Sequence, residues 1–174
     1  MSTFCESAPE WLRRAIVAAT ETGLRPADLV KLTRGLIVTT PKGRRIQVRT
    51  SKSGDRQIAS VPVTAAMARI VDETPADRLL ILVNVGGQAL CEKWLSKAIR
   101  KHCRAAGLGD RLGLYDARGM ACTRLLRAGA RLDHIALAMG WSKKTAADML
   151  ESYARLDPDL TDAILDLLEN KSVQ

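Results

Sequence analysis

The chain has 174 residues, which fits a single domain whose core is large enough to be stable without disulfides. Its formal net charge of +8 leaves nucleic acid, an anionic membrane and an acidic protein open as partners. No apolar run approaches the roughly 20 residues that span a bilayer, and no leader pattern opens the chain, so we expect a cytoplasmic protein. Apolar residues make up 47% of the chain but aromatic residues only 3%, which favours an aliphatic, helical core.

The cysteines and histidines give no sign of a metal site. The four cysteines lie far apart with no CxxC pair, and the two histidines complete no metal-ligand spacing: Cys5, Cys91, Cys103, Cys122, His102 and His134. We therefore expect reduced, mostly buried thiols and neither a metal nor another cofactor.

Two helices are expected at the start of the chain. Apolar residues recur at helical spacing from Pro9 to Thr22, and Gly23 is a typical C-terminal stop. Pro26 fits the first turn of a second helix, which we expect to run through Val30 and Leu32.

The pattern between Gly35 and Val63 changes from helical spacing to runs rich in β-branched residues. Three such runs, "LIVTT", "RIQVRT" and "QIASVPV", are separated by the turn-rich segments "PKGRR" and "SKSGD". We predict a three-stranded antiparallel sheet.

Helical spacing returns from Thr64 to Asp72 and again in a long amphipathic helix from Gln88 to Ala106, which Gly107 ends. One face of this long helix is apolar, with Leu95, Ile99, Cys103 and Ala106. Another face is basic, with Lys93, Lys97, Arg100, Lys101 and Arg104. The basic face fits a DNA backbone, and it equally fits an ordinary solvated helix surface.

Beyond Leu112 we expect helices almost to the end, interrupted at Gly129, at the turn "GWS" and at Pro158. The final segment "LTDAILDLLENKSVQ" has one apolar face, which suits docking on its own core or on a neighbouring protomer. The fold class expected for the whole chain is mainly α with a small three-stranded antiparallel β-sheet (α+β).

Two segments supply residue types that suit the cleavage of a phosphodiester without a metal. That reaction needs a nucleophile held in line, cations on the non-bridging oxygens and an acid for the leaving oxygen. The segment "TGLRPADL" offers Arg25 and Asp28 between two predicted helices. The segment "LYDARGMACTRLLRAGARLDHIALAMGWSKKTAADMLESYA" offers a further arginine, a tryptophan and two tyrosines.

These segments resemble the tyrosine recombinases of the phage-integrase type, in the order of that family and from about Thr22 to Tyr153. The first-arginine box of the family matches "TGLRPADL", and the hairpin lysine matches Lys52. Tyr115 and Arg118 match the H-x-x-R box of the family. Gly140 and Trp141 match its pair of glycine with histidine or tryptophan, and Tyr153 matches its nucleophile.

The resemblance implies a catalytic domain that breaks and rejoins DNA without a metal. It implies that Tyr153 attacks the phosphate, forming a 3′-phosphotyrosyl link, and that Lys52 protonates the leaving 5′ oxygen. The remaining implied roles are a phosphate clamp by Arg25 and Arg118, a hydrogen bond from the Trp141 indole N–H, and support of the site by Asp28.

The sequence departs from the family pattern at Tyr115, where most members have histidine. A phenol with a pKa near 10 is a poor base at neutral pH, so Tyr115 fits hydrogen bonding to the phosphate or positioning of Arg118. This leaves the acceptor of the nucleophile's proton unassigned.

The resemblance also implies partners and a domain organisation. We expect residues 1–174 to be one catalytic domain without the N-terminal core-binding domain that clamps DNA in full-length members. The expected partners are double-stranded DNA and other recombinase protomers, in a tetramer on DNA with exchange of the C-terminal helix. We expect a bacterial cytoplasmic protein that associates with DNA.

Three other functions remain open at this stage. A type IB topoisomerase shares the chemistry but acts as a monomer. A non-catalytic DNA-binding module fits "RLDHIALAMGWSKKTAADMLESY" as a helix-turn-helix with "KKTAADML" as its recognition helix, but leaves Arg25, Lys52 and Arg118 unexplained. An inactive family member is the third, because of Tyr115.

Overall fold

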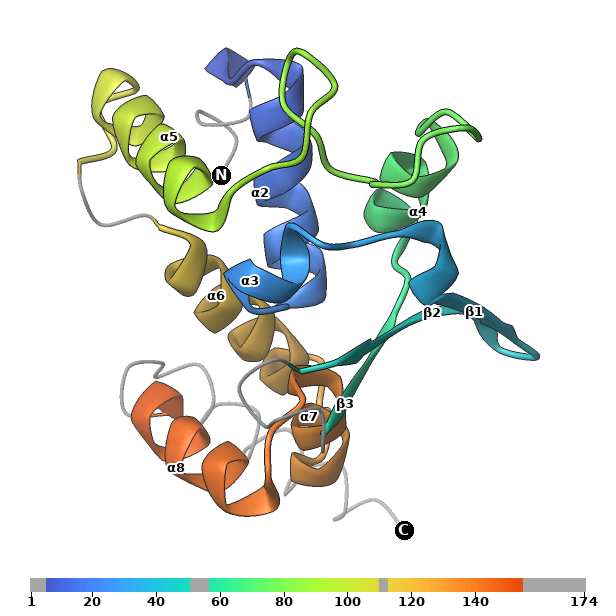
Figure 1. Ribbon diagram of the computed structural model, residues 1–174. Helices are drawn as coiled ribbons and strands as arrows, with labels where there is room; N and C mark the ends of the chain where they lie inside the picture. The colour runs from blue at the N-terminus through green and yellow to red at the C-terminus, as the bar shows by residue number, and fades with distance from the viewer. Residues whose placement is uncertain (1–5, 51–56, 110–112, 155–174) are drawn as a thin grey trace, which may run out of the picture.

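The computed structural model describes residues 6–50, 57–109 and 113–154, and it shows a mainly helical chain with one three-stranded antiparallel sheet (Figure 1). The helices are α2 (Glu10–Thr22), α3 (Pro26–Leu29), α4 (Ala65–Asp72), α5 (Glu92–Ala105), α6 (Leu114–Arg127), α7 (Leu132–Met139) and α8 (Lys143–Ala154), with a 3-10 turn η1 (Arg34–Leu36). The strands are β1 (Ile37–Thr40), β2 (Gly43–Arg49) and β3 (Ile58–Pro62). The expected fold class is confirmed.

Helix α2 lies in the middle of the fold and contacts α4, α5 and α6 (Figure 1). It is amphipathic, and its buried face includes Leu12, Ile16 and Ala19. The helix ends as predicted, because Gly23 takes the left-handed conformation with φ +61° and donates its N–H to the Ala19 carbonyl.

The prediction for the second helix was too long at its C-terminal end. Helix α3 begins at Pro26 as expected but ends at Leu29 instead of running through Val30 and Leu32. The chain becomes extended after a short turn, because the Leu32 carbonyl accepts from the Ile81 N–H and Thr33 forms an isolated bridge with Leu80. Tertiary pairing with a distant segment therefore overrides the local helical pattern.

The sheet has the order β1-β2-β3, and the three predicted strands are confirmed. Strand β1 pairs with β2 from Thr40 opposite Gly43 to Ile37 opposite Ile46. Strand β3 pairs with β2 as far as Arg49. The last three residues of β2 therefore have a strand partner on one side only.

Helix α5 begins at Glu92, four residues later than predicted. The side chain of Asn84 accepts hydrogen bonds from the N–H groups of Gly86 and Gln88, and Val83 bridges Ala89, so this stretch forms a turn before the helix. The two faces are as predicted: the buried residues are Leu95, Ile99 and Cys103, and the exposed ones include Lys93, Lys97, Arg100, Lys101 and Arg104.

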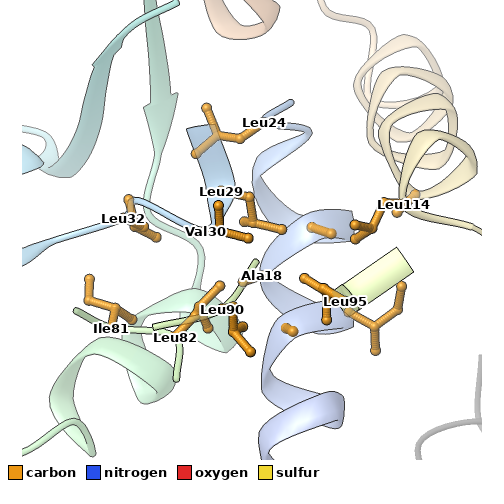
Figure 2. Close-up of a cluster of buried hydrophobic side chains, with 14 of the residues drawn as sticks. Ala18, Leu24, Leu29, Val30, Leu32, Ile81, Leu82, Leu90, Leu95 and Leu114 are labelled. Carbon is orange, nitrogen blue, oxygen red and sulfur yellow. The ribbon is translucent and has the colours of Figure 1, made fainter. Parts of the chain in front are cut away.

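The main core is aliphatic, as the composition predicts. Figure 2 shows leucines, isoleucine and valine from four other parts of the chain gathered against α2, and Leu29, Leu32 and Leu95 are completely buried. A second, smaller core of Ala121, Cys122, Ile135 and Met139 joins α6 to α7. Within the described residues, no helix is long and apolar enough to cross a membrane.

The predicted breaks at Gly129 and at the "GWS" turn separate α6, α7 and α8, whereas Pro158 lies outside the described residues. Gly129 ends the first of them with φ +74°, and Gly140 ends the second with φ +61°. Ser142, in the predicted "GWS" turn, caps α8 because its Oγ accepts from the Thr145 N–H at 3.1 Å. The predicted final segment, residues 160–174, lies outside the described residues.

Candidate active site

Arg118 is the centre of the candidate site and joins three helices. It lies on α6 and is only 8% exposed. Its Nη1 donates to the Gly23 carbonyl at the end of α2, and its Nη2 donates to the Met139 carbonyl at the end of α7, at 2.6 Å. One guanidinium group therefore fixes two helix ends that are far apart in the sequence.

Physical chemistry accounts for this placement. The C-terminal end of a helix carries partial negative charge on its unsatisfied carbonyls, so a cation is stabilised there. Burial of a guanidinium is unfavourable unless its donors are satisfied, and the carbonyls of Gly23 and Met139 satisfy two of them. The helix ends thus hold the Arg118 guanidinium in one orientation.

Two glycines let these helix ends approach each other. A Cβ at Gly23 would lie 2.7 Å from Met139 Cε, and a Cβ at Gly140 would lie 2.5 Å from Thr50 Cγ2 and 3.2 Å from Ala59 Cβ. Gly140 therefore also seats the end of α7 against the ends of β2 and β3. The sequence resemblance identified Gly140, but it did not identify the backbone carbonyls of Gly23 and Met139, because side-chain patterns carry no signal of them.

Arg25 lies two residues after Gly23, at the N-terminal cap of α3. Its side chain is partly buried, and its Nη1 is buried without a hydrogen-bond acceptor among the residues that the structure describes. Asp28, on the same short helix, is 4% exposed. The first-arginine box is thus placed beside the helix end that binds Arg118.

Trp141 completes this group. The Arg118 guanidinium carbon lies 4.9 Å from the centroid of the Trp141 ring, which is a cation–π contact. The ring is half-buried and packs against the small core between α6 and α7. Arg118 and Trp141 therefore contact each other at the end of α7, and Arg25 lies two residues beyond the Gly23 carbonyl that Arg118 bonds.

The other predicted site residues are less fully defined. Tyr115 lies in the first turn of α6, three residues before Arg118, and is 69% exposed. Tyr153 belongs to α8, which packs against α7, but its side chain lies outside the described part. Lys52 lies outside the described residues as well.

The cysteines form no disulfide among the residues that the structure describes. Cys91 is exposed, whereas Cys103 and Cys122 are buried, and all three are free thiols; Cys5 lies outside the described residues. Burial raises the pKa of the Cys122 thiol to about 11, and the positive charge of Arg118 opposes this only in part. Within residues 6–50, 57–109 and 113–154, no cluster of three or more histidine, cysteine or acidic residues suits a metal ion.

Solved structures show the same fold in proteins that act on DNA. The lambda integrase (75-356) dimer bound to a COC′ core site has a TM-score of 0.67 and 21% identity, covering 84% of this chain and 54% of that one. XerH recombinase bound to a palindromic difH substrate has a TM-score of 0.66 and 18% identity, covering 97% and 51%. The lambda integrase catalytic core has a TM-score of 0.64 and 20% identity, covering 79% and 83%.

The chain thus spans about half the length of the first lambda integrase structure and of the XerH structure, but most of the lambda integrase catalytic core. A comparison with curated protein sequences gave no match. The sequence profile described as the Phage integrase family matches residues 1–159, which is most of the 174 residues. Together with the fold and the site, this match shows that the chain belongs to the phage integrase family, the tyrosine recombinases that its motifs resemble.

Proposed function

We propose that this chain is the catalytic domain of a site-specific tyrosine recombinase or integrase, which cleaves and rejoins double-stranded DNA through a covalent phosphotyrosyl intermediate. The observation that carries the proposal is the position of Arg118. Its side chain bonds to the carbonyl of Gly23, 95 residues away in sequence, and lies against the ring of Trp141. Arg25 follows Gly23 by two residues, so residues from three separate motifs meet at one point.

The two arginines suit a clamp on the scissile phosphate. A guanidinium group matches two phosphate oxygens with parallel hydrogen bonds, which an ammonium group does not. A buried donor without an acceptor is unfavourable by about 1–3 kcal/mol, and Arg25 Nη1 has none among the described residues. A phosphate oxygen is the acceptor that we propose for it, and Arg118 is already oriented by the two helix ends.

The proposed chemistry is a reversible transesterification. The Tyr153 hydroxyl gives up its proton, its oxygen forms a bond to phosphorus, and the bond from phosphorus to the 5′ oxygen breaks. Lys52 donates a proton to that leaving oxygen, and Trp141 donates its indole N–H to a non-bridging oxygen. A 5′-hydroxyl from another strand reverses the step and releases Tyr153, so neither ATP nor a metal enters the balance.

The proposed partners are double-stranded DNA and further recombinase protomers, assembled as a tetramer on DNA with exchange of the C-terminal helix. The net charge of +8 suits a DNA backbone. Solved relatives of this fold include a lambda integrase dimer bound to a core site and a lambda integrase tetramer bound to a Holliday junction. In such an assembly a core-binding domain clamps the far side of the DNA, and residues 1–174 supply the catalytic part.

Covalent trapping tests this proposal, and the chain offers a matched control because it has only two tyrosines, Tyr115 and Tyr153. The probe is a library of duplexes with randomised sequence and a sulfur in place of the 5′-bridging oxygen, since a thiolate leaves readily and religates poorly. Wild-type protein and Tyr115→Phe should form denaturant-resistant adducts, and Tyr153→Phe should form none. Sequencing the captured strands then defines a duplex substrate, and adducts that persist in Tyr153→Phe would overturn the assignment.

The same substrate tests the role of Lys52. Because a thiolate needs no proton to leave, Lys52→Ala should cleave the sulfur-bridged duplex at nearly the wild-type rate and the normal duplex far more slowly. Equal losses on both duplexes would exclude Lys52 as the general acid.

Two rival functions give different results. A type IB topoisomerase would relax supercoiled DNA as a monomer and would not exchange strands between two duplexes. A helix-turn-helix module has support from the helix pair α7 and α8 and from the exposed Lys143 and Lys144 at the start of α8. Such a module would bind DNA without forming any adduct.

A further inference from the structure

A cavity lies where β2 lacks a neighbour on one side. Strand β1 stops pairing at Ile46, so the segment from Gln47 to Arg49 pairs only with β3. The space beside it has a volume of about 510 Å³ and is lined by the following residues from α3, the turns after it, β2 and β3: Asp28, Lys31, Leu36, Gln47, Val48, Arg49 and Ile58. The open edge of β2 therefore faces the short helix that carries the first-arginine box.

Two cations from different elements line this cavity. Lys31 follows α3 and Arg49 ends β2, and both side chains are exposed. Neither side chain has a hydrogen bond or an ion pair to any residue that the structure describes. Other arginines among the described residues do have such partners: the half-buried Arg44 bonds Asp72, and the exposed Arg131 bonds Asp133.

The residues that line the cavity are also close in sequence to residues with proposed roles in catalysis. Asp28 lines it, and Arg25 is the N-terminal cap of the same four-residue helix. Arg49 precedes Lys52, the proposed general acid, by three residues in the sequence. The residues that line this cavity are therefore neighbours in the chain of Arg25 and Lys52.

We propose that Lys31 and Arg49 hold a phosphate of the DNA backbone that neighbours the scissile phosphate, and so set the register of the strand in the active site. This inference rests on the proposed function. The cavity suits one nucleotide unit, because Leu36 and Val48 give it an apolar wall for a deoxyribose while the two cations meet the phosphate. Asp28 lines the same cavity but is only 4% exposed, whereas Lys31 and Arg49 are exposed.

Either lysine or arginine can bind a backbone phosphate at such a site. An exposed lysine or arginine that meets one phosphate adds affinity by releasing counterions, and this contribution falls as salt rises. It carries no base preference, so the pair positions the strand without reading its sequence. The sequence alone gives no reason to select these two from the 27 lysines and arginines of the chain.

The test pairs protein variants with single neutral phosphates in the duplex that covalent trapping defines. Lys31→Gln and Arg49→Gln should each weaken binding about 3- to 10-fold near physiological salt and lower the salt slope by about 1. A methylphosphonate at one position beside the scissile phosphate should reproduce this loss in wild-type protein. The same methylphosphonate should add little further loss in either variant, because the contact is already absent.

Arg69→Gln is the control, since Arg69 is an exposed arginine on α4 that also has no partner among the described residues. The binding loss in Arg69→Gln should add to the loss that each methylphosphonate causes, at every position. Arg49→Lys should recover most of the binding that Arg49→Gln loses, which a purely steric role would not predict. Thermal melting of all these variants should match that of the wild type.

The inference is overturned if every methylphosphonate position is additive with Lys31→Gln and Arg49→Gln, or if neither variant changes the salt slope. That outcome leaves the proposed function intact as long as wild-type protein still forms the Tyr153 adduct. Absence of any adduct in the wild type would instead remove the proposed function itself.

Discussion

Positive charge lies in two very different environments in this molecule. One is Arg118, where α2, α6 and α7 meet, and the other is the basic face of α5. Arg118 is buried, bonded to two helix ends and stacked on Trp141. The α5 face is broad and exposed, with Lys93, Lys97, Arg100, Lys101 and Arg104 all open to solvent. Both regions could be recognised in the sequence, but only the Arg118 side chain is held in one orientation by hydrogen bonds to the rest of the fold.

The comparison separates a cation that acts through a fixed geometry from cations that act only through their charge. A buried guanidinium loses its hydration, so the protein must supply acceptors that also fix its orientation. Exposed side chains keep their hydration and many rotamers, so they act as an electrostatic surface. We therefore expect changes at the junction to affect both stability and cleavage, and changes on α5 to affect only salt-dependent binding.

The largest effect is expected from Arg118→Ala. Loss of the guanidinium leaves the Gly23 and Met139 carbonyls without this donor, so the free energy of unfolding should fall by about 2–4 kcal/mol. Strand cleavage should fall at least about 10²–10³-fold, as when one preorganised donor is removed from an active site. Chemical denaturation and single-turnover cleavage measure the two effects, and a stable, active variant would contradict the account.

Arg25→Gln separates the two effects. Arg25 Nη1 has no acceptor among the described residues, so its removal breaks no hydrogen bond to them and the melting temperature should stay near that of the wild type. Cleavage should nevertheless fall about 10²–10³-fold. A variant that melts much earlier than the wild type would show that Arg25 is mainly structural.

A glycine substitution tests whether the helix ends must meet. In Gly140→Ala the new Cβ meets Thr50 and Ala59 and the backbone has a positive φ, so we expect a loss of about 1–3 kcal/mol. Gly129→Ala is the matched control, because its φ is also positive but nothing lies within 4 Å of an added Cβ. Thermal melting of the pair should place Gly140→Ala clearly below Gly129→Ala, and equal melting temperatures would argue against close packing at Gly140.

Neutralising the α5 face should give a smaller and purely electrostatic effect. In the double variant Lys97→Gln/Lys101→Gln, the salt slope of DNA binding should fall by about 1–2 while the melting temperature stays unchanged. The cleavage rate of the bound complex should also stay unchanged. Identical salt slopes in the variant and the wild type would favour a solvated helix face that does not contact DNA.

The smallest effect concerns an exposed ion pair between β2 and α4. The hydrogen bond from Arg44 lowers the pKa of Asp72, so the pair stabilises the fold above the ordinary aspartate pKa of about 3.9 and loses this contribution as pH falls through the lower folded value. Asp72→Asn should therefore melt slightly below the wild type at pH 7, with no difference in strong acid. A difference that persists in strong acid would require another explanation.

Much of the fold could be predicted from the sequence because its signals are local. The three strands, the stop at Gly23 and the turn at "GWS" depend on nearby residues and appear as predicted. The end of α3 could not be predicted, because the hydrogen bond from Ile81 to the Leu32 carbonyl joins distant segments.

The candidate site shows the same division. The motif order predicted that Arg25, Arg118 and Trp141 belong together. In the structure Arg118 contacts the Trp141 ring, and Arg25 lies two residues beyond the Gly23 carbonyl that Arg118 bonds. The means of holding them was not predictable, because the backbone carbonyls of Gly23 and Met139 hold Arg118 and carbonyls leave no pattern in a sequence. The unpaired segment of β2, with Arg49 at its end, likewise depends on strand register and not on composition.

The most direct test of the central claim is peptide mapping of the trapped adduct by mass spectrometry. After nuclease digestion, the account predicts that the residual nucleotide is linked through its 3′ phosphate to the peptide that contains Tyr153. A nucleotide on the peptide that contains Tyr115, or on no tyrosine at all, would contradict it.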